Sequence, residues 1–167
     1  STHCISSAAS DVYKRQQEKQ RAVDAITNYA VWDAKESATF ATAGLEVGVD
    51  HIFTVDDLAD FGITTEDIAS VDATTVPVRV KGRIDRLERT DAGQYVIVDF
   101  KTGKTVPSKK DTQDNAQLAL YQLALSGSDK DTTPVVKAKL VYLRPRSGSL
   151  GERDQQALDA DERKRWR

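Results

Sequence analysis

The chain of 167 residues contains one cysteine, Cys4, and two histidines, His3 and His51. One cysteine cannot form an intrachain disulfide and excludes a thiolate-rich zinc site, and the two histidines lack a metal-binding spacing. No apolar run approaches the roughly 20 residues that cross a bilayer, and residues 1–16 contain no apolar segment of the kind found in signal peptides. These absences predict a cytoplasmic protein without a membrane partner.

The charge is balanced overall but unevenly distributed. The net charge is −2, and no Lys or Arg occurs from Phe40 to Val78. The next segment is basic: Arg79, Lys81, Arg83, Arg86, Arg89, Lys101, Lys104, Lys109 and Lys110. A basic segment of this kind favours an anionic partner such as nucleic acid, although a solvated face without a partner is an equal alternative.

The length and composition predict one soluble globular domain, with 39% hydrophobic and 30% charged residues. Residues 1–16 are small and polar, which predicts a disordered tail or a segment foreign to the protein. We place the folded domain at residues 17–150. Residues 151–167 are expected to be a charged C-terminal tail, with a short helix as one alternative.

The segment 82–101, GRIDRLERTDAGQYVIVDFK, has the pattern of a β-hairpin. Two β-rich runs flank Asp91-Ala92-Gly93, and Gly suits the left-handed position that closes a three-residue loop. This loop would place Leu87 opposite Ile97 and Asp85 opposite Asp99. Facing carboxylates repel unless one is protonated or a cation lies between them. Lys101 shares the face of Asp99, so the hairpin predicts a divalent-metal site with a cationic neighbour.

The other segments predict an α/β fold, with a mixed central sheet flanked by helices. Helices are expected at residues 17–36 and 111–126, and further strands at 45–55, with a bulge at Gly48, and at 135–143. Residues 56–75 have the character of an insertion. The helical stripe of the first segment consists of Ala22, Val23, Ile26, Tyr29, Ala30 and Trp32.

The hairpin resembles the PD-(D/E)XK nuclease superfamily in its RecB-like branch. The matching blocks are Gly82-Arg83-Ile84-Asp85-Arg86, then Ile97-Val98-Asp99-Phe100-Lys101-Thr102-Gly103, and then Gln117 with Tyr121. The sequence is most similar in appearance to the nuclease domain at the C-terminus of actinobacterial UvrD/Rep-type helicases. The resemblance covers roughly residues 20–160 and implies a restriction-endonuclease-like fold.

The resemblance also implies an activity and its residues. It implies a DNA exonuclease that uses Mg²⁺ or Mn²⁺ and processes DNA ends in recombinational repair, linked to helicase motor domains. Asp85, Asp99 and Lys101 would be catalytic, and Asp85, Asp99 and the backbone carbonyl of Phe100 would bind metal. Five residues would contact DNA: Gln117, Tyr121, Arg83, Arg86 and Lys104.

One expected part has no counterpart in the sequence. Many RecB-like nucleases carry an additional His or Glu metal ligand on an upstream helix, and the surroundings of His3 do not resemble that helix. Glu46, at the start of a predicted strand, is expected to be structural rather than a ligand. Two alternatives therefore stay open, a non-catalytic DNA-binding or scaffolding domain of a helicase and a stand-alone endonuclease.

Overall fold

The structure, a computed structural model, describes residues 2–54, 78–126 and 132–158, with the backbone alone for residues 2–6 and Val78. Its centre is a five-stranded sheet in the order β1-β2-β3-β4-β5. The strands β3 and β4 are parallel, and the other neighbours are antiparallel, so the sheet is mixed as predicted. The strands are β1 (Ala41–Phe53), β2 (Val78–Arg89), β3 (Tyr95–Lys101), β4 (Val135–Tyr142) and β5 (Gly151–Gln156).

The predicted hairpin is confirmed as β2 and β3. Gly93 has a φ of 80°, and Thr90 N–H donates to the Gln94 carbonyl at 2.8 Å across the loop. Leu87 pairs with Ile97 as predicted, but the paired register ends at Arg86 and Val98, so the predicted pairing of Asp85 with Asp99 lies just beyond it. The first five residues of β3 are all buried, because β3 is the central strand with both faces covered.

The prediction of one continuous helix at 111–126 is wrong. It is divided into α4 (Lys109–Gln113) and α5 (Ala116–Ser126). The Ser108 hydroxyl accepts a hydrogen bond from Asp111 N–H at 3.0 Å, and Asn115 Oδ1 accepts one from Leu118 N–H at 3.0 Å. Each helix therefore begins at its own side-chain cap, which interrupts the helical ladder between them.

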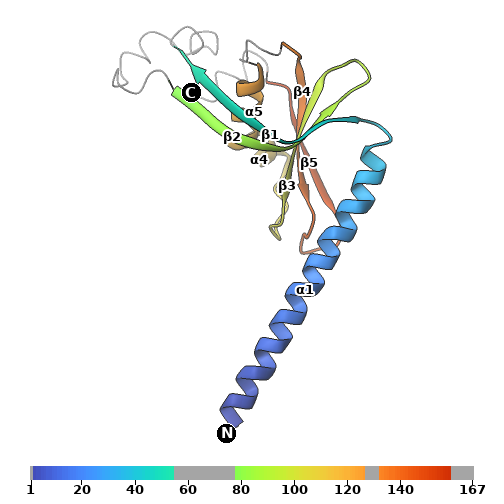
Figure 1. The fold of residues 1–167 in the computed structure, drawn as a ribbon, viewed down its shortest axis with the longest axis vertical. Coiled ribbons are helices and arrows are strands. Elements are labelled where there is room, and N and C mark those ends of the chain that lie inside the picture. The colour runs from blue at the N-terminus through green and yellow to red at the C-terminus, as the bar shows by residue number, and fades with distance from the viewer. Residues whose placement is uncertain (1, 55–77, 127–131, 159–167) are drawn as a thin grey trace.

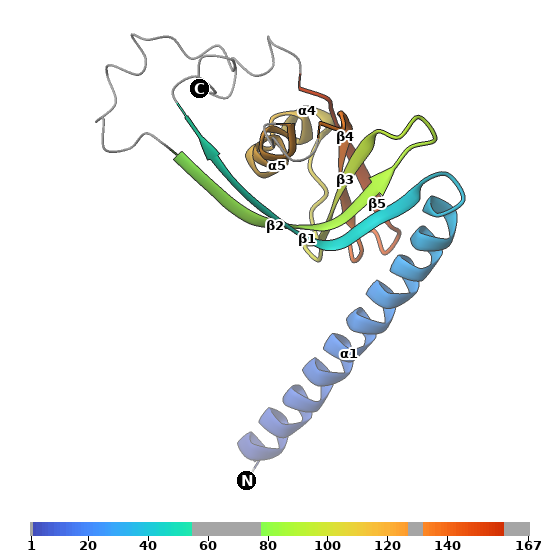
Figure 2. The same cartoon turned by 45° about the horizontal axis from the view of Figure 1, so that its top comes forward.

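The helices lie on opposite sides of the sheet. Figure 2 shows α4 and α5 on one side and α1 on the other. The larger core lies between α5 and the sheet, and its fully enclosed side chains include Ile84, Ile97, Leu118 and Leu140. A smaller core under the end of α1 contains Trp32, Val96, Val98 and Val141. This layered arrangement fixes β3, the strand that carries Asp99 and Lys101, from both sides.

Helix α1 (Thr2–Glu36) is longer than predicted. It begins at Thr2 rather than near residue 17, because residues 2–36 contain no Gly or Pro to end it. Only its C-terminal part packs on the sheet, and the rest extends away from it (Figure 1). Val23 and Ile26 of the predicted apolar stripe are consequently 47% and 69% exposed. Neither this helix nor another in the described ranges is apolar enough to cross a membrane.

Strand β1 is irregular at a different place from the one predicted. The register with β2 shifts between Thr42 and Gly44, so the bulge predicted at Gly48 is wrong. Glu46 is the one non-glycine residue with positive φ, 51°, in the described chain. The neighbouring pairs Leu45–Arg86 and Val47–Ile84 place Glu46 beside Asp85 across the two strands.

The segment after residue 150 contains a strand. Residues Gly151–Gln156 form β5 and pair with β4, so the helical alternative for the tail is wrong over these residues. Gln155 is completely buried, and its amide donates to the carbonyls of Thr112, Gln113 and Asn115 at 3.0–3.2 Å. Gln155 of β5 thus fixes the backbone of the segment that joins α4 to α5. The predicted insertion at 56–75 and residues 159–167 lie outside the described residues.

Candidate active site

Asp85 lies where the regular alternation of β2 is interrupted. Ile84 and Leu87 belong to the same apolar core although three positions separate them, whereas a regular strand would direct them to opposite faces. At this interruption Asp85 Oδ2 accepts a hydrogen bond from Phe100 N–H at 2.8 Å. The bond fixes Asp85 directly against the strand segment that carries the second carboxylate, Asp99.

Lys101 connects the second carboxylate to helix α5. Its Nζ lies 2.8 Å from Asp99 Oδ2 and donates to Gln117 Oε1 at 2.9 Å. Gln117 Nε2 in turn donates to the Tyr121 hydroxyl at 3.4 Å. The sequence-predicted residues Asp99, Lys101, Gln117 and Tyr121 therefore form one continuous polar chain across β3 and α5.

The charges within this chain modify one another. Burial raises the pKa of Asp99, the Lys101 ammonium opposes that shift, and the adjacent Asp85 adds to it, with the pKa raised overall. Burial lowers the pKa of Lys101, but its hydrogen bond and attraction to Asp99 outweigh burial and raise that pKa above its ordinary value. Lys101 therefore carries a positive charge at neutral pH.

The absence of a side chain at Gly82 allows the Tyr121 ring to pack against the backbone of β2. A Cβ at position 82 would lie 3.0 Å from Tyr121 Cε1 and 3.4 Å from its hydroxyl. The close approach of the ring to the β2 backbone depends on the absence of a side chain here. It positions the tyrosine at the end of the polar chain that starts at Asp99.

Three cationic residues were predicted to contact DNA, and they differ in how far their side chains are exposed. Arg83 is 68% exposed and lies 3.5 Å from Glu46, and Lys104 is exposed after β3. Arg86, by contrast, is 2% exposed. Its guanidinium donates to Asp33 Oδ1 and stacks 5.0 Å from the centre of the Trp32 ring. The prediction that Arg86 contacts DNA is therefore wrong, because helix α1 already covers it.

Arg86 instead packs between the hairpin and helix α1. Trp32, on which it stacks, meets the Phe100 ring edge-on at 5.2 Å between centroids, and Tyr29 does so at 5.4 Å. Phe100 separates Asp99 from Lys101 in the sequence, so helix α1 packs against the middle of the segment that carries both residues. Asp33 and Trp32 were not predicted in this role, since nothing local in the sequence links them to a strand 53 residues later.

A second group of charges is buried beside Arg86. Lys139 Nζ donates to Glu36 at 2.7 Å and to Glu152 at 3.0 Å, and Glu88, which is fully buried, lies 3.5 Å from Arg86. Burial and the nearby negative charge of Glu36 raise the pKa of Glu88 to about 8, against the attraction of Arg86 and Lys139. Glu88 is therefore largely protonated at neutral pH.

The residues present suit a hard divalent cation. Asp85 and Asp99 offer carboxylate oxygens from adjacent strands. In the described part of the chain, no group of three or more His, Cys, Asp or Glu side chains has an arrangement that could hold a metal. Mg²⁺ is commonly held by one or two carboxylates with waters and substrate phosphates as the other ligands. Two carboxylates next to a protonated lysine fit that donor set, which would leave room for a phosphodiester.

Comparison with known proteins assigns the chain to a family. The sequence model described as the PD-(D/E)XK nuclease superfamily matches residues 3–167. No curated protein matches this chain. Among solved structures, the crystal structure of SSO0001 is similar, with a TM-score of 0.45 and 19% sequence identity. The alignment covers 93% of this chain but only 66% of that one, slightly less than two thirds of its length.

Proposed function

The chain belongs to the PD-(D/E)XK nuclease superfamily, and on this premise we propose that it is a metal-dependent deoxyribonuclease. The observation that supports this most directly is the convergence of Asp85, Asp99 and Lys101 at the end of the β2–β3 hairpin. Lys101 lies 2.8 Å from Asp99, and the Phe100 backbone between them bonds to Asp85. A purely structural ion pair would not require the second carboxylate to lie at the same place.

In the proposed reaction, water attacks a phosphodiester and a sugar oxygen leaves. Asp85 and Asp99, with the Phe100 carbonyl, would hold Mg²⁺ or Mn²⁺, which lowers the pKa of bound water and stabilises the leaving oxygen. Lys101 would direct a positive charge at the phosphate as negative charge develops on it. Its bond to Gln117 restricts the ammonium, and Gln117 and Tyr121 would contact the strand next to the scissile phosphate.

The proposal that the domain is an exonuclease rests on the resemblance of the sequence blocks to helicase-linked nucleases. On that basis we assign the domain to DNA end processing in recombinational repair, in the cytoplasm, with covalently linked or associated helicase motor domains. Exposed Arg83 and Lys104 next to the site fit an anionic DNA substrate.

A second candidate function is a non-catalytic DNA-binding or scaffolding domain. One observation favours it: Asp85 and Asp99 are not joined by a third side chain that could complete a metal site within the described residues. The intact Lys101 favours catalysis, because a binding platform does not require an ammonium held between a buried carboxylate and Gln117.

End-labelled linear DNA and closed circular DNA, each incubated with Mg²⁺ or Mn²⁺, distinguish these functions. The proposal predicts that the linear substrate is degraded from its ends, that the circle survives, and that a chelator stops the reaction. Cutting of the circle would indicate an endonuclease instead. Binding of both substrates, with no cleavage of either, would favour the scaffolding function.

A further inference from the structure

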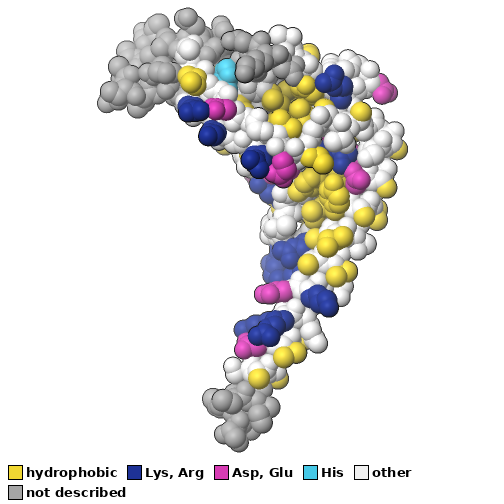
Figure 3. Space-filling view, viewed as in Figure 1, with side chains coloured by type: hydrophobic (Ala, Val, Ile, Leu, Met, Phe, Trp, Pro, Cys, Tyr) yellow, Lys and Arg dark blue, Asp and Glu magenta, His cyan; other side chains and the backbone are white. Residues whose placement is uncertain are grey.

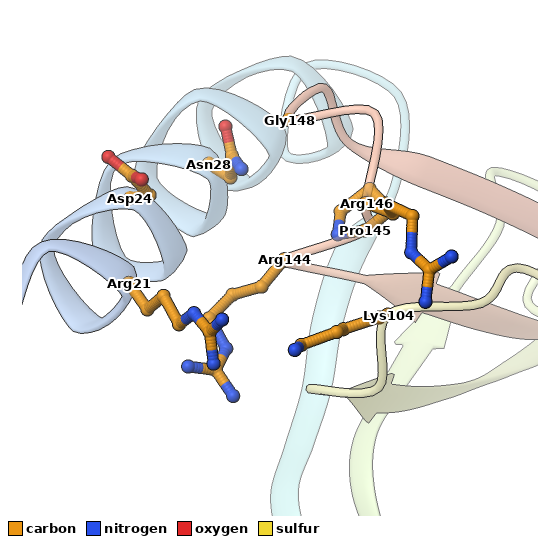
Figure 4. A pocket seen from close by; sticks show the side chains of 8 residues that line it. All are labelled: Arg21, Asp24, Asn28, Lys104, Arg144, Pro145, Arg146 and Gly148. Atoms are coloured by element: carbon orange, nitrogen blue, oxygen red, sulfur yellow. The ribbon is translucent and has the colours of Figure 1, made fainter. Parts of the chain in front are cut away.

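A basic pocket lies where helix α1 meets the ends of β3 and β4. It has a volume of about 260 Å³, and Figure 4 shows the side chains that surround it. Its lining comes from three separate segments of the chain: Arg21, Asp24 and Asn28 of α1, Lys104 after β3, and Arg144, Pro145, Arg146 and Gly148 after β4. None of these residues belongs to the matched sequence blocks, although Lys104 was predicted to contact DNA.

Hydrogen bonds hold the walls of this pocket in place. Asn28 Nδ2 donates to the Leu143 carbonyl at 2.6 Å, which ties α1 to the end of β4. Arg146 N–H donates to the Lys104 carbonyl at 2.8 Å, which joins the two loops. These two bonds fix the relative positions of the three segments that line the pocket.

The charge inside the pocket is strongly positive. Four cations and one carboxylate line it, and Asp24 already accepts a hydrogen bond from Gln20 at 2.9 Å. In Figure 4 the side chains of Arg21, Arg144 and Lys104 extend toward one another, whereas the Asp24 carboxylate points away from them. Like charges brought together repel, so this arrangement favours a bound anion.

Arg144 gives independent evidence for a ligand. Its Nε is buried and has no hydrogen-bond partner in the described chain, while its Nη2 donates to the Thr102 carbonyl at 3.3 Å. A buried donor without an acceptor costs free energy that an anionic oxygen would recover. A phosphate, with several acceptor oxygens, matches a guanidinium flanked by further cations.

The pocket and the candidate active site lie at the same end of β3, with the pocket on the α1 side of the sheet and Gln117, the partner of Lys101, on the α5 side. Leu143 N–H donates to the Lys101 carbonyl at 3.0 Å, so the residue before Arg144 is bonded to the catalytic lysine's own backbone. Thr102, the partner of Arg144, follows Lys101 in the sequence. We propose that the pocket binds a backbone phosphate of the same nucleic-acid strand whose scissile phosphate lies at Asp85, Asp99 and Lys101.

The proposal rests on the nuclease function and adds a second phosphate contact to it. In the complex, the strand would run from the hairpin toward the junction of α1 with the sheet. Figure 3 shows Lys and Arg side chains gathered on one side of α1 below that junction. Helix α1 would then contact the nucleic-acid strand as well as pack against Phe100.

The test is a binding assay in Ca²⁺ with single-stranded DNA in which one phosphate at a time is replaced by an uncharged methylphosphonate. The pocket variant is Arg21→Ala with Arg146→Ala, because both side chains are exposed. The matched control is Arg15→Ala with Lys19→Ala, which removes two exposed charges of α1 outside the pocket. Arg144→Lys keeps the charge and serves as a second variant.

In the wild type, a methylphosphonate at one particular position, other than that of the scissile phosphate, should weaken binding by roughly tenfold to a hundredfold. This is the loss expected when charge-assisted hydrogen bonds to a phosphate are removed. The same replacement should have little effect in the pocket variant and keep its full effect in the control. Arg144→Lys should lose part of that effect, because an ammonium cannot replace the guanidinium fork.

Equal sensitivity of the pocket variant and the control to every replacement would overturn the proposal, since α1 would then act only as a general positive charge. Competition by free inorganic phosphate without any position-dependent effect would also overturn it and indicate a site for a small anion. These outcomes are separate from the nuclease function, because cleavage by the wild type and its loss in Asp99→Asn are measured on unmodified DNA.

Discussion

Asp85 and Phe100 are joined by a hydrogen bond of 2.8 Å from the Phe100 backbone N–H to the Asp85 carboxylate. This bond links the two strands at the place where the ladder between β2 and β3 ends at Arg86 and Val98. It fixes the first carboxylate relative to Asp99 and Lys101, which flank Phe100. The site is therefore a property of the hairpin's geometry and not of a flexible loop.

Replacement of Lys101 by Ala should reduce turnover far more than DNA affinity. Loss of one preorganised electrostatic contact typically lowers the rate about a hundredfold to a thousandfold. Lys101 lies at the end of β3 and its partner Gln117 is exposed, but its partner Asp99 is buried, so a melting curve of the variant accompanies the kinetics. Single-turnover cleavage and binding in Ca²⁺ measure the two effects. A loss confined to binding would mean that Lys101 merely holds substrate.

Replacement of Gly82 by Ala should displace Tyr121. The added methyl would lie 3.0 Å from the ring, and insertion of extra atoms at a packed position typically costs about 1–3 kcal/mol of stability. The matched control is Gly48→Ala on the neighbouring strand, where nothing lies within 4 Å of the added Cβ. Thermal melting and cleavage should both decline for Gly82→Ala. Identical behaviour of the two variants would contradict the close packing at Gly82.

The β2–β3 hairpin was predictable from the sequence because local chemistry specifies it. Gly93 provides the left-handed loop position, and the loop length sets the register that pairs Leu87 with Ile97. Helical spacing places Gln117 and Tyr121 on one face of their helix, but their position beside Asp99 and Lys101 was expected only from the resemblance to the family. The resemblance to a family added the expectation that the group is catalytic.

Features that depend on distant partners were not predictable. Arg86 has the pattern of an exposed cation, and only the packing of Asp33 and Trp32 from α1 makes it buried. The bulge was predicted at Gly48 because glycine is the usual signal, but the backbone irregularity lies at Thr42 to Gly44 and at Glu46. The basic pocket draws on three separate segments, so no single segment of sequence indicates it.

The positive φ of Glu46, 51°, predicts a difference between two substitutions. Glu46→Ala and Glu46→Gly both remove the exposed contact with Arg83, but only alanine retains the left-handed backbone with a Cβ. Such a conformation costs a non-glycine residue about 1–2 kcal/mol, partly offset by the greater freedom of glycine in the unfolded chain. Denaturant unfolding should therefore find Glu46→Gly the more stable of the two. The reverse order would mean that the backbone relaxes at this position.

The buried carboxyl of Glu88 predicts a pH dependence of stability. Its pKa is raised to about 8 in the folded protein, so between the ordinary glutamate range and pH 8 the folded state binds the proton that the unfolded state releases. The stabilisation is complete at low pH and is lost as pH rises through 8. Glu88→Gln, which stays neutral, should lack this decline. Melting temperatures of both proteins from pH 5 to 9 test it, and parallel curves would contradict a shifted pKa.

The central claim is that Asp85 and Asp99 hold a divalent cation that, with Lys101, supports phosphodiester hydrolysis. The most direct measurement is Mn²⁺ binding by calorimetry together with single-turnover cleavage of linear DNA, for the wild type and for Asp99→Asn. The account predicts that the wild type binds Mn²⁺ and cleaves, and that Asp99→Asn loses both while its melting curve remains cooperative. Undiminished metal binding and cleavage in folded Asp99→Asn would contradict it.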